Sequence, residues 1–159
     1  MFKFFKKEYA LIAPISGKII DLGQVPDEVF AQKMTGDGVA IESTGDIIVA
    51  PADGTLTLIF RTNHAFSMKL ANGVDIIIHI GIDTVGLQGE GFERIATEGT
   101  KVKAGDPIIK IDREFILSKG LNLITPVLIT NMDKISSLTL PENASVEYGK
   151  DTILTYKIK

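Results

Sequence analysis

The sequence predicts an all-β protein, an antiparallel β-sandwich of short strands with a few short helices. Apolar and β-branched runs recur along the whole chain, and glycine separates many of them, which is typical of sandwiches and barrels. A length of 159 residues with a hydrophobic fraction of 45% is sufficient for one domain with a buried core.

Eight segments are the expected strands: "GKIIDL" from Gly17, "GVAIES" from Gly38, "DIIVA" from Asp46, "GTLTLIF" from Gly54, "VDIIIHIGI" from Val74, "DPIIKID" from Asp106, "TPVLITN" from Thr125 and "DTILTYKI" from Asp151. A helical pattern is confined to residues 26–34, 90–99 and 112–120. The last of these segments starts at a capping aspartate and stops at a glycine.

The chain also contains a short, weak internal repeat. "APISGKII" from Ala13 recurs as "APADGTLTLI" from Ala50, and in each copy proline ends one extended piece while glycine allows the turn into the next. A related spacing of glycine and proline between extended segments follows in "EGTKVKAGDPIIKI" from Glu98. These turns resemble those of the hybrid motif in lipoyl and biotinyl carrier domains, so we expect a sandwich built by internal duplication.

Residues 13–159 are expected to form a single domain, and residues 1–12 a flexible leader. The leader places Phe2 and Phe5 beside lysines, which fits either a frayed basic end or one amphipathic turn with at most peripheral membrane contact. No signal-peptide core can be drawn in it. No run approaches the roughly 20 apolar residues of a spanning helix, so we expect a cytoplasmic protein.

Charge and cysteine content exclude several classes of function. The net charge of −3 argues against nucleic acid as a partner, because such binding needs clustered positive charge. The chain contains 0 cysteines, which excludes disulfides, a thiolate nucleophile and cysteine metal ligands.

The only 2 histidines of the chain, His64 and His79, fall within one predicted hairpin. Alternation along the second strand places Ile76, Ile78, Ile80 and Ile82 on a core face and His79 on the opposite face. With a turn at Asn72-Gly73, Phe66 opposes His79 and the histidines are diagonal neighbours; with a loop centred on Ala71-Asn72, the histidines are directly opposed. An odd-length loop would separate them, and a bend is expected near Asn63.

A pair of imidazoles in an apolar setting suits nucleophilic attack, proton transfer or zinc binding. The sequence lacks the glycine-rich phosphate loop of nucleotide-dependent phosphoryl transfer and the GxSxG elbow of serine hydrolases. Zinc at His64 and His79 would need a further ligand, from Asp75 or Asp83. The alternative is purely structural: both histidines are partly buried, hydrogen-bonded residues that have no functional role.

Several motifs together resemble the glucose-type enzyme IIA of the bacterial phosphoenolpyruvate-dependent sugar phosphotransferase system. They are "VPDEVFAQKMTGDGVAI", "APADGT", "NHAFSM", "GVDIIIHIGIDTV", "GEGFERIATEGTKVKAGD" and "TPVLITNMD". The resemblance implies a phosphohistidine carrier with His79 as the acceptor, His64 as the partner that contacts the phosphoryl group, and Thr62 as the residue that orients His64. It implies HPr as the donor, a cysteine of a permease IIB domain as the acceptor, and no required cofactor.

The resemblance also implies a partner-binding surface around the histidines. Its members are Asp27, Val29, Phe30, Phe60, Phe66, Ile77, Asp83 and Val85. Four positions carry side chains that differ from those common in the family: Glu28, Met34, Thr35 and Ile77. These differences lie on the docking surface, so they affect the expected choice of partner more than the expected chemistry. A zinc-dependent hydrolase and a regulatory module whose protein targets read the phosphorylation state are the alternatives.

Overall fold

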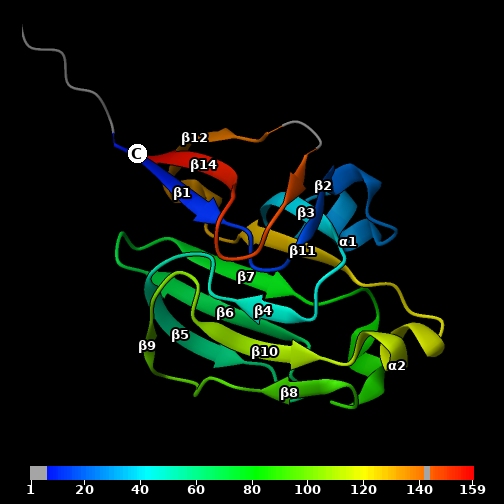
Figure 1. Ribbon diagram of the computed structural model, residues 1–159. Helices are drawn as coiled ribbons and strands as arrows, with labels where there is room; N and C mark the ends of the chain where they lie inside the picture. Colours follow the sequence, from blue (N-terminus) through cyan, green and yellow to red (C-terminus); the bar gives the residue numbers. More distant parts are fainter. Residues whose placement is uncertain (1–6, 142–143) are drawn as a thin grey trace, which may run out of the picture.

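The computed structural model describes residues 7–141 and 144–159 (Figure 1). In chain order the elements are β1 Glu8–Ile12, β2 Gly17–Asp21, the 3-10 helix η1 Leu22–Gln24, α1 Glu28–Ala31, β3 Asp37–Ser43, β4 Ile47–Val49, β5 Gly54–Ile59, β6 Ala65–Leu70, β7 Asp75–His79, η2 Thr84–Leu87, β8 Phe92–Arg94, β9 Lys101–Val102, β10 Pro107–Ile111, α2 Arg113–Ser118, β11 Ile124–Ile129, η3 Met132–Lys134, β12 Ile135–Thr139, β13 Ser145–Val146 and β14 Thr152–Ile158. The predicted all-β class with few short helices is confirmed.

The strands form one large sheet and two small ones. The large sheet has 8 strands in the order β13-β2-β3-β11-β7-β6-β5-β9, and the small sheets have the orders β1-β14-β12 and β4-β10-β8. Neighbouring strands are antiparallel. Figure 1 shows β4 and β10 of the small sheet in front of β6 and β5, β8 at the bottom of the view, and the sheet with β1 and β14 at the top.

The predicted internal duplication is visible in the sheet order and in the hydrogen bonds. The strand order of the large sheet is symmetric about its centre. From the two ends inward, β13 corresponds to β9, β2 to β5, β3 to β6 and β11 to β7, and the last two strands are neighbours at the centre. The two Ala-Pro turns bind each other reciprocally: the amide of Ile12 donates to the carbonyl of Pro51 (2.9 Å), and that of Val49 donates to the carbonyl of Pro14 (2.8 Å). The sandwich is therefore built from two related halves.

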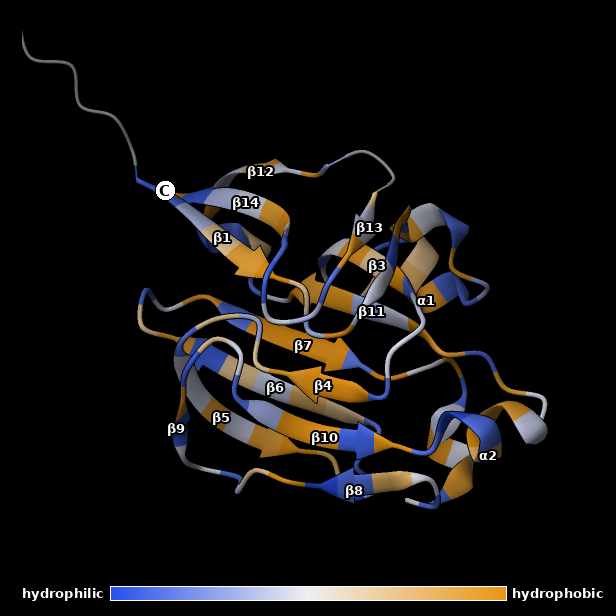
Figure 2. Cartoon of the chain, in the orientation of Figure 1, coloured by the Kyte–Doolittle hydropathy of each residue, from blue (hydrophilic) through white to orange (hydrophobic). Residues whose placement is uncertain are grey.

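The main core lies between the large sheet and the two small sheets. Ile41, Ile76 and Ile78 of the large sheet are at most 1% exposed and pack in one cluster with Ile109 of β10 and Leu154 of β14. Figure 2 shows the hydrophobic colouring concentrated along β7, β4 and β10. Each such side chain contributes about 1.5 to 3 kcal/mol on burial, so the period-2 isoleucines position β7 firmly.

A smaller cluster covers part of the opposite face of the large sheet. Its buried members are Ile20, Leu22, Val25, Phe30, Ala40, Ile82 and Leu128. They come from β2, β3 and β11, from η1 and the residue after it, from α1, and from the segment after β7. Because α1 stands over this face next to the end of β7, the second cluster forms one wall of the histidine site.

Two of the sequence predictions for local structure are wrong. Glu8–Ile12, expected in a flexible leader, forms β1 and pairs with β14; the amphipathic turn predicted near Phe2 and Phe5 lies outside the described residues. The expected helix at 90–99 contains β8 instead, which pairs with β10. Glycines at both ends of that segment disfavour a helix, and pairing anchors Phe92, which is 9% exposed.

The other predicted helices are present in shortened form. The side chain of Asp112 caps α2 by accepting a hydrogen bond from the amide of Phe115 (3.2 Å), and Gly120 follows with φ of 77°. Asp27 caps α1 in the same way. Within the described part of the chain, no helix has the length and apolar character needed to span a membrane.

Candidate functional site

His79 is the last residue of β7 and lies on the face opposite the main core. Its neighbours Ile78 and Ile80 are 0% exposed, whereas His79 itself is half-buried, as alternation along the strand predicts. Gly81 follows with φ of 79°, and this left-handed residue turns the chain. Ile82 consequently packs in the second cluster rather than in the predicted core stripe.

A backbone contact determines which nitrogen of His79 is free. The Nδ1 atom lies 2.7 Å from the carbonyl oxygen of Gly81, and a carbonyl only accepts hydrogen bonds. Nδ1 therefore carries the proton, and in the neutral ring the lone pair is on Nε2. Burial lowers the pKa of His79 below 6.5, against smaller raising effects from the Gly81 hydrogen bond, Asp27 and Asp83, so the ring is neutral and nucleophilic near pH 7.

The hairpin register differs from both predicted registers. Ala65 pairs with His79 and Phe66 with Ile78, because the loop has three residues, 71–73. The Gly73 amide donates to the Leu70 carbonyl at 3.0 Å, and Gly73 has φ of 86°, as in a type I turn followed by a left-handed glycine. A regular continuation of β6 would place residue 64 on the core face with Ile80.

The predicted bend at Asn63 is what brings the histidines together. Asn63 has φ of 58° and immediately precedes His64, so the strand alternation is interrupted there. The imidazole rings of His64 and His79 lie 5.0 Å apart between centroids, with an angle of 78° between their planes. The predicted proximity is confirmed, although the reason is the bend and not the register.

Thr62 lies beside His64, as expected from its position in the motif. Its Oγ1 atom is hydrogen bonded to His64 Nδ1 at 2.5 Å, which orients the ring and leaves Nε2 available. His64 is 4% exposed, and burial together with the neighbouring His79 lowers the pKa of His64 to about 4. Both rings are therefore uncharged in the resting protein.

An apolar rim surrounds the two rings. The Phe30 ring lies 5.0 Å from that of His79, and the Phe60 ring lies 5.4 Å from that of His64. Val29 and Val85 are 41% and 53% exposed, and partly buried Ile77 packs against the second cluster. Exposed apolar groups around a polar centre are typical of a protein docking surface.

The model of the family described as phosphoenolpyruvate-dependent sugar phosphotransferase system, EIIA 1, matches residues 9–135. The chain belongs to this family. As an EIIA component it is a phosphotransferase that carries a phosphoryl group in sugar uptake.

Relatives and a solved structure agree with the assignment to EIIA. A glucose-specific EIIA component of Haemophilus influenzae is 47% identical, over 94% of this chain and 90% of the relative. One from Borreliella burgdorferi is 45% identical, over 98% and 86%. The structure of glucose permease IIA from Mycoplasma capricolum superposes with a TM-score of 0.89 at 37% identity, covering 97% of this chain and 99% of that one.

Some relatives are much longer than this EIIA chain. The N-acetylglucosamine-specific EIICBA component of Klebsiella pneumoniae is 46% identical over 94% of this chain, but the match spans 23% of that protein. In such relatives the EIIA part is fused to the other permease components.

Two carboxylates stand at the edge of the EIIA site. Asp27 accepts a hydrogen bond from the Val29 amide (2.9 Å) as the cap of α1. Asp83 is exposed, has φ of 60° and makes no capping hydrogen bond with its side chain. Both raise the pKa of His79 electrostatically, so both carboxylates lie close to that ring.

Phe66 does not belong to this surface. The sequence prediction put it on the histidine face, but it pairs with Ile78, is 0% exposed and packs in the main core. The register set by the three-residue loop moves every side chain of β6 to the other face. Ile124, which the prediction missed, packs partly buried against the second cluster.

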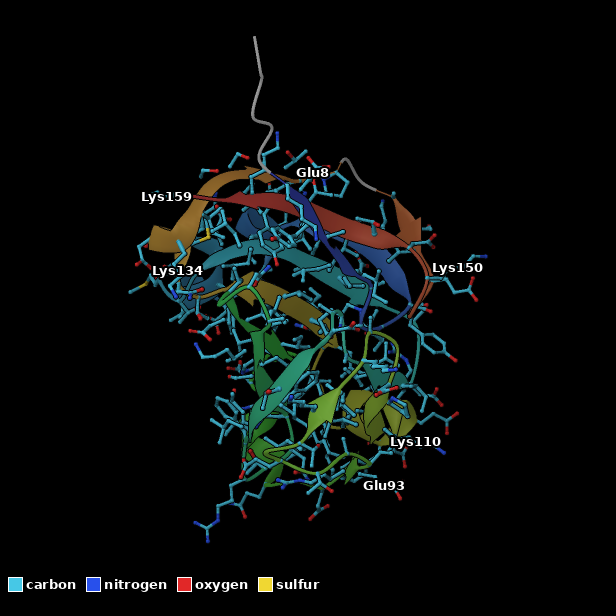
Figure 3. All side chains as sticks on the ribbon, turned by 90° about the vertical axis from the view of Figure 1, so that its left-hand side faces the viewer. Glu8, Glu93, Lys110, Lys134, Lys150 and Lys159 are labelled. Carbon is cyan, nitrogen blue, oxygen red and sulfur yellow. The ribbon has the colours of Figure 1, made fainter. Side chains whose placement is uncertain are left out.

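The available metal donors do not suggest a second chemistry at the histidines. Among residues 7–141 and 144–159, no group of three His, Cys, Asp or Glu side chains is placed to hold a metal ion. Two imidazoles are one ligand short of a catalytic zinc site, so the donor set does not fit a resident zinc. A cavity of about 820 Å³ lies elsewhere in the molecule. Its lining includes Glu93 and Lys110, which Figure 3 labels in the lower part of its view, and it includes neither histidine.

Proposed function

We propose that His79 accepts the phosphoryl group at Nε2. The hydrogen bond from its Nδ1 to the Gly81 carbonyl supports this most strongly, because it leaves the Nε2 lone pair free. In the reaction the Nε2 atom attacks phosphorus, an N–P bond forms at His79, and the N–P bond to the donor imidazole breaks. Neutral imidazole needs no general base, so positioning and charge stabilisation carry the catalysis.

His64 is proposed as the group that stabilises the phosphoryl oxygens. If the Thr62 hydroxyl donates to Nδ1, the Nε2–H of His64 is the remaining donor of the ring. The ring lies against that of His79, within reach of a group on its Nε2. A bound phosphoryl group is strongly negative, so it favours protonation of His64 and strengthens this hydrogen bond.

The proposed donor is the phosphohistidine of HPr, and the proposed acceptor is a cysteine of a permease IIB domain. In the second transfer the cysteine thiolate attacks phosphorus, an S–P bond forms, and His79 recovers its lone pair as the N–P bond breaks. EIIA relatives for glucose and N-acetylglucosamine match this chain equally well, at 47% and 46% identity. We infer that the sugar is selected by other components.

Docking is proposed to use the apolar rim and the two edge carboxylates. Val29, Phe30, Phe60, Ile77 and Val85 would exclude water from the transferring group, which protects a labile N–P bond from hydrolysis. Asp27 and Asp83 suit partners that are basic where they meet this surface, because complementary charge raises association rates. A relay with such partners belongs in the cytoplasm, and a chain without cysteine is suited to that reducing compartment.

A regulatory role would follow from the same site. Phosphorylation adds about −1.5 to −2 charges within a rim of exposed valines, so protein targets can distinguish the two states. Pull-downs with wild type and His79→Gln should then recover different partners when HPr, enzyme I and phosphoenolpyruvate are present. Identical partners in both would reject this regulation.

The relay itself is tested by incubating the protein with phosphoenolpyruvate, enzyme I and HPr and measuring acid-labile phosphate. Wild type should be labelled and His79→Gln should not. His64→Gln should accept the label but pass it to a IIB domain slowly. Label on His79→Gln would reject the assigned acceptor, and normal transfer by His64→Gln would reject the partner role.

A further inference from the structure

The turn before His64 is held in an uncommon backbone conformation. The Asn63 amide donates to the Phe60 carbonyl at 2.7 Å, which closes a tight turn over residues 60–63. Asn63 ends it with φ of 58°, a region that L-residues other than glycine occupy rarely, asparagine being among the least disfavoured. Thr62 lies within this turn and His64 directly after it, so the turn sets the position of both.

Arg94 of β8 binds this turn at its first and its last residue. Its Nε and Nη2 atoms donate to Asn63 Oδ1 at 3.0 and 2.9 Å, and Nη2 also reaches the Phe60 carbonyl at 3.4 Å. A planar guanidinium presents such donors in a rigid fork. β8 belongs to a small sheet and β6 to the large one, so the contact joins two layers of the sandwich at the site.

A second charged side chain from the same segment supports the start of the turn. Glu98 accepts a hydrogen bond from the Ile59 amide at 2.8 Å through Oε1. In the described part of the chain, neither Arg94 nor Glu98 is among the residues that form ion pairs within 4.0 Å. The motif "GEGFERIATEG" therefore directs two charged groups to the backbone and side chain of residues 59–63.

We propose that Arg94 is a positioning residue for phosphoryl transfer: by clamping Phe60 and Asn63 it fixes Thr62, and through Thr62 the ring of His64. The inference rests on the proposed relay function. Arg94 touches neither imidazole, and the pKa of His64 is lowered by burial and by His79 without a contribution from Arg94. Its effect is therefore geometric, and displacements near 1 Å at a reacting site cost up to about 100-fold in rate.

The first test replaces the fork but keeps the charge. Arg94→Lys should slow phosphoryl transfer from His79 to a IIB domain by about tenfold, which corresponds to about 1.4 kcal/mol. Glu93→Gln, an exposed neighbour on β8, is the matched control and should transfer at the wild-type rate. A wild-type rate for Arg94→Lys would overturn the proposal.

A double-mutant cycle tests whether Arg94 acts through the turn. Asn63→Gly removes the Oδ1 acceptor and adopts positive φ without strain. If the clamp acts through Asn63, Arg94→Lys should slow transfer less than about threefold in the Asn63→Gly background, because the coupled effects are not additive. If the two substitutions reduce the transfer rate by factors that simply multiply, Arg94 acts by a route other than Asn63.

The ring of His64 supplies a readout that a purely structural role would not change. Nitrogen-15 NMR of the unphosphorylated protein should show altered His64 Nδ1 and Nε2 shifts in Arg94→Lys, with those of His79 unchanged. Unaltered His64 shifts would reject the positioning role. This measurement needs no phosphoryl donor, so it decides the role of Arg94 even if wild type proves unable to accept phosphate and the proposed relay fails.

Discussion

The Nδ1 atom of His79 and the carbonyl oxygen of Gly81 are joined by a 2.7 Å hydrogen bond within the same segment of chain. This contact selects one tautomer of His79 and fixes the ring plane. The proposed chemistry therefore depends on the backbone at Gly81, since any shift of that carbonyl would free Nδ1 or rotate the ring.

The phosphoryl group should consequently be attached to Nε2 of His79. Nδ1 is occupied by the Gly81 carbonyl, so attack from that nitrogen would first require the hydrogen bond to break. Phosphorus-31 and nitrogen-15 NMR of the phosphorylated protein distinguish the two isomers. An Nδ1-linked phosphohistidine would contradict the tautomer assigned from the structure.

Gly81→Ala should impair both folding and phosphorylation. A Cβ atom there would lie 2.5 Å from the Thr84 side chain and 2.9 Å from the Asn122 carbonyl, at φ of 79°. Left-handed strain and overpacking together predict a loss of about 2 to 4 kcal/mol in unfolding free energy. Urea denaturation and the labelling rate measure the two effects.

Gly86→Ala is the matched control for that substitution. A Cβ at Gly86 meets nothing within 4 Å, so its stability and labelling should equal those of wild type. If Gly81→Ala behaved like Gly86→Ala, the close packing around the Gly81 carbonyl would be disproved.

Stability should fall with acidification because His64 is buried uncharged. Its pKa is about 4 in the folded protein and 6.5 as a reference, so the unfolded chain binds more protons between these values. The contribution of His64 is therefore complete above pH 6.5 and is lost as pH falls toward 4. Between pH 7.5 and 5 this predicts a loss of up to about 2 kcal/mol, less to the extent that solvent screens the ring.

The contribution of His64 can be separated from that of the carboxylates with His64→Gln. Urea midpoints of wild type and variant should differ in their pH dependence between pH 7.5 and 5, with the steeper fall in wild type. Parallel curves would show that His64 is not held neutral by burial.

Removing the edge charges should slow docking while leaving the chemistry intact. Asp27→Asn keeps the helix cap, and Asp83→Asn keeps a residue that tolerates its positive φ. Each should reduce the rate of phosphorylation by HPr about three- to tenfold at low ionic strength, and the difference should shrink in high salt. Asp133→Asn on exposed η3 is the control; an unchanged salt dependence in the site variants would exclude steering.

Phe66 and Phe30 should respond differently to truncation. Phe66 is 0% exposed in the main core, so Phe66→Leu should lower the unfolding free energy by about 1 kcal/mol and leave the labelling rate unchanged. Phe30→Leu, next to His79 at 5.0 Å, should slow labelling. A docking defect in Phe66→Leu would restore the sequence-based assignment that the register contradicts.

Several parts of the fold were predictable from local pattern. The alternation of isoleucines around His79 predicted the correct face for this histidine, the caps Asp112 and Gly120 located α2, and the repeated Ala-Pro turns indicated the duplication. β12 and β13 were not predictable, because "ISSLT" and "SV" have little apolar periodicity and are strands only through their partners.

The sequence by itself determined the all-β class, the exposure of His79 away from the isoleucine core and membership of the EIIA family. Only the tertiary structure decided that His64 reaches His79, that Phe66 is buried, and that Arg94 holds Asn63. The physical reason is that strand alternation is a local property of the chain. The hairpin register depends instead on the exact length of the loop between β6 and β7, and a shift of one residue in register reverses every side chain of a strand. The left-handed bend at Asn63 is held by Arg94 of a different sheet.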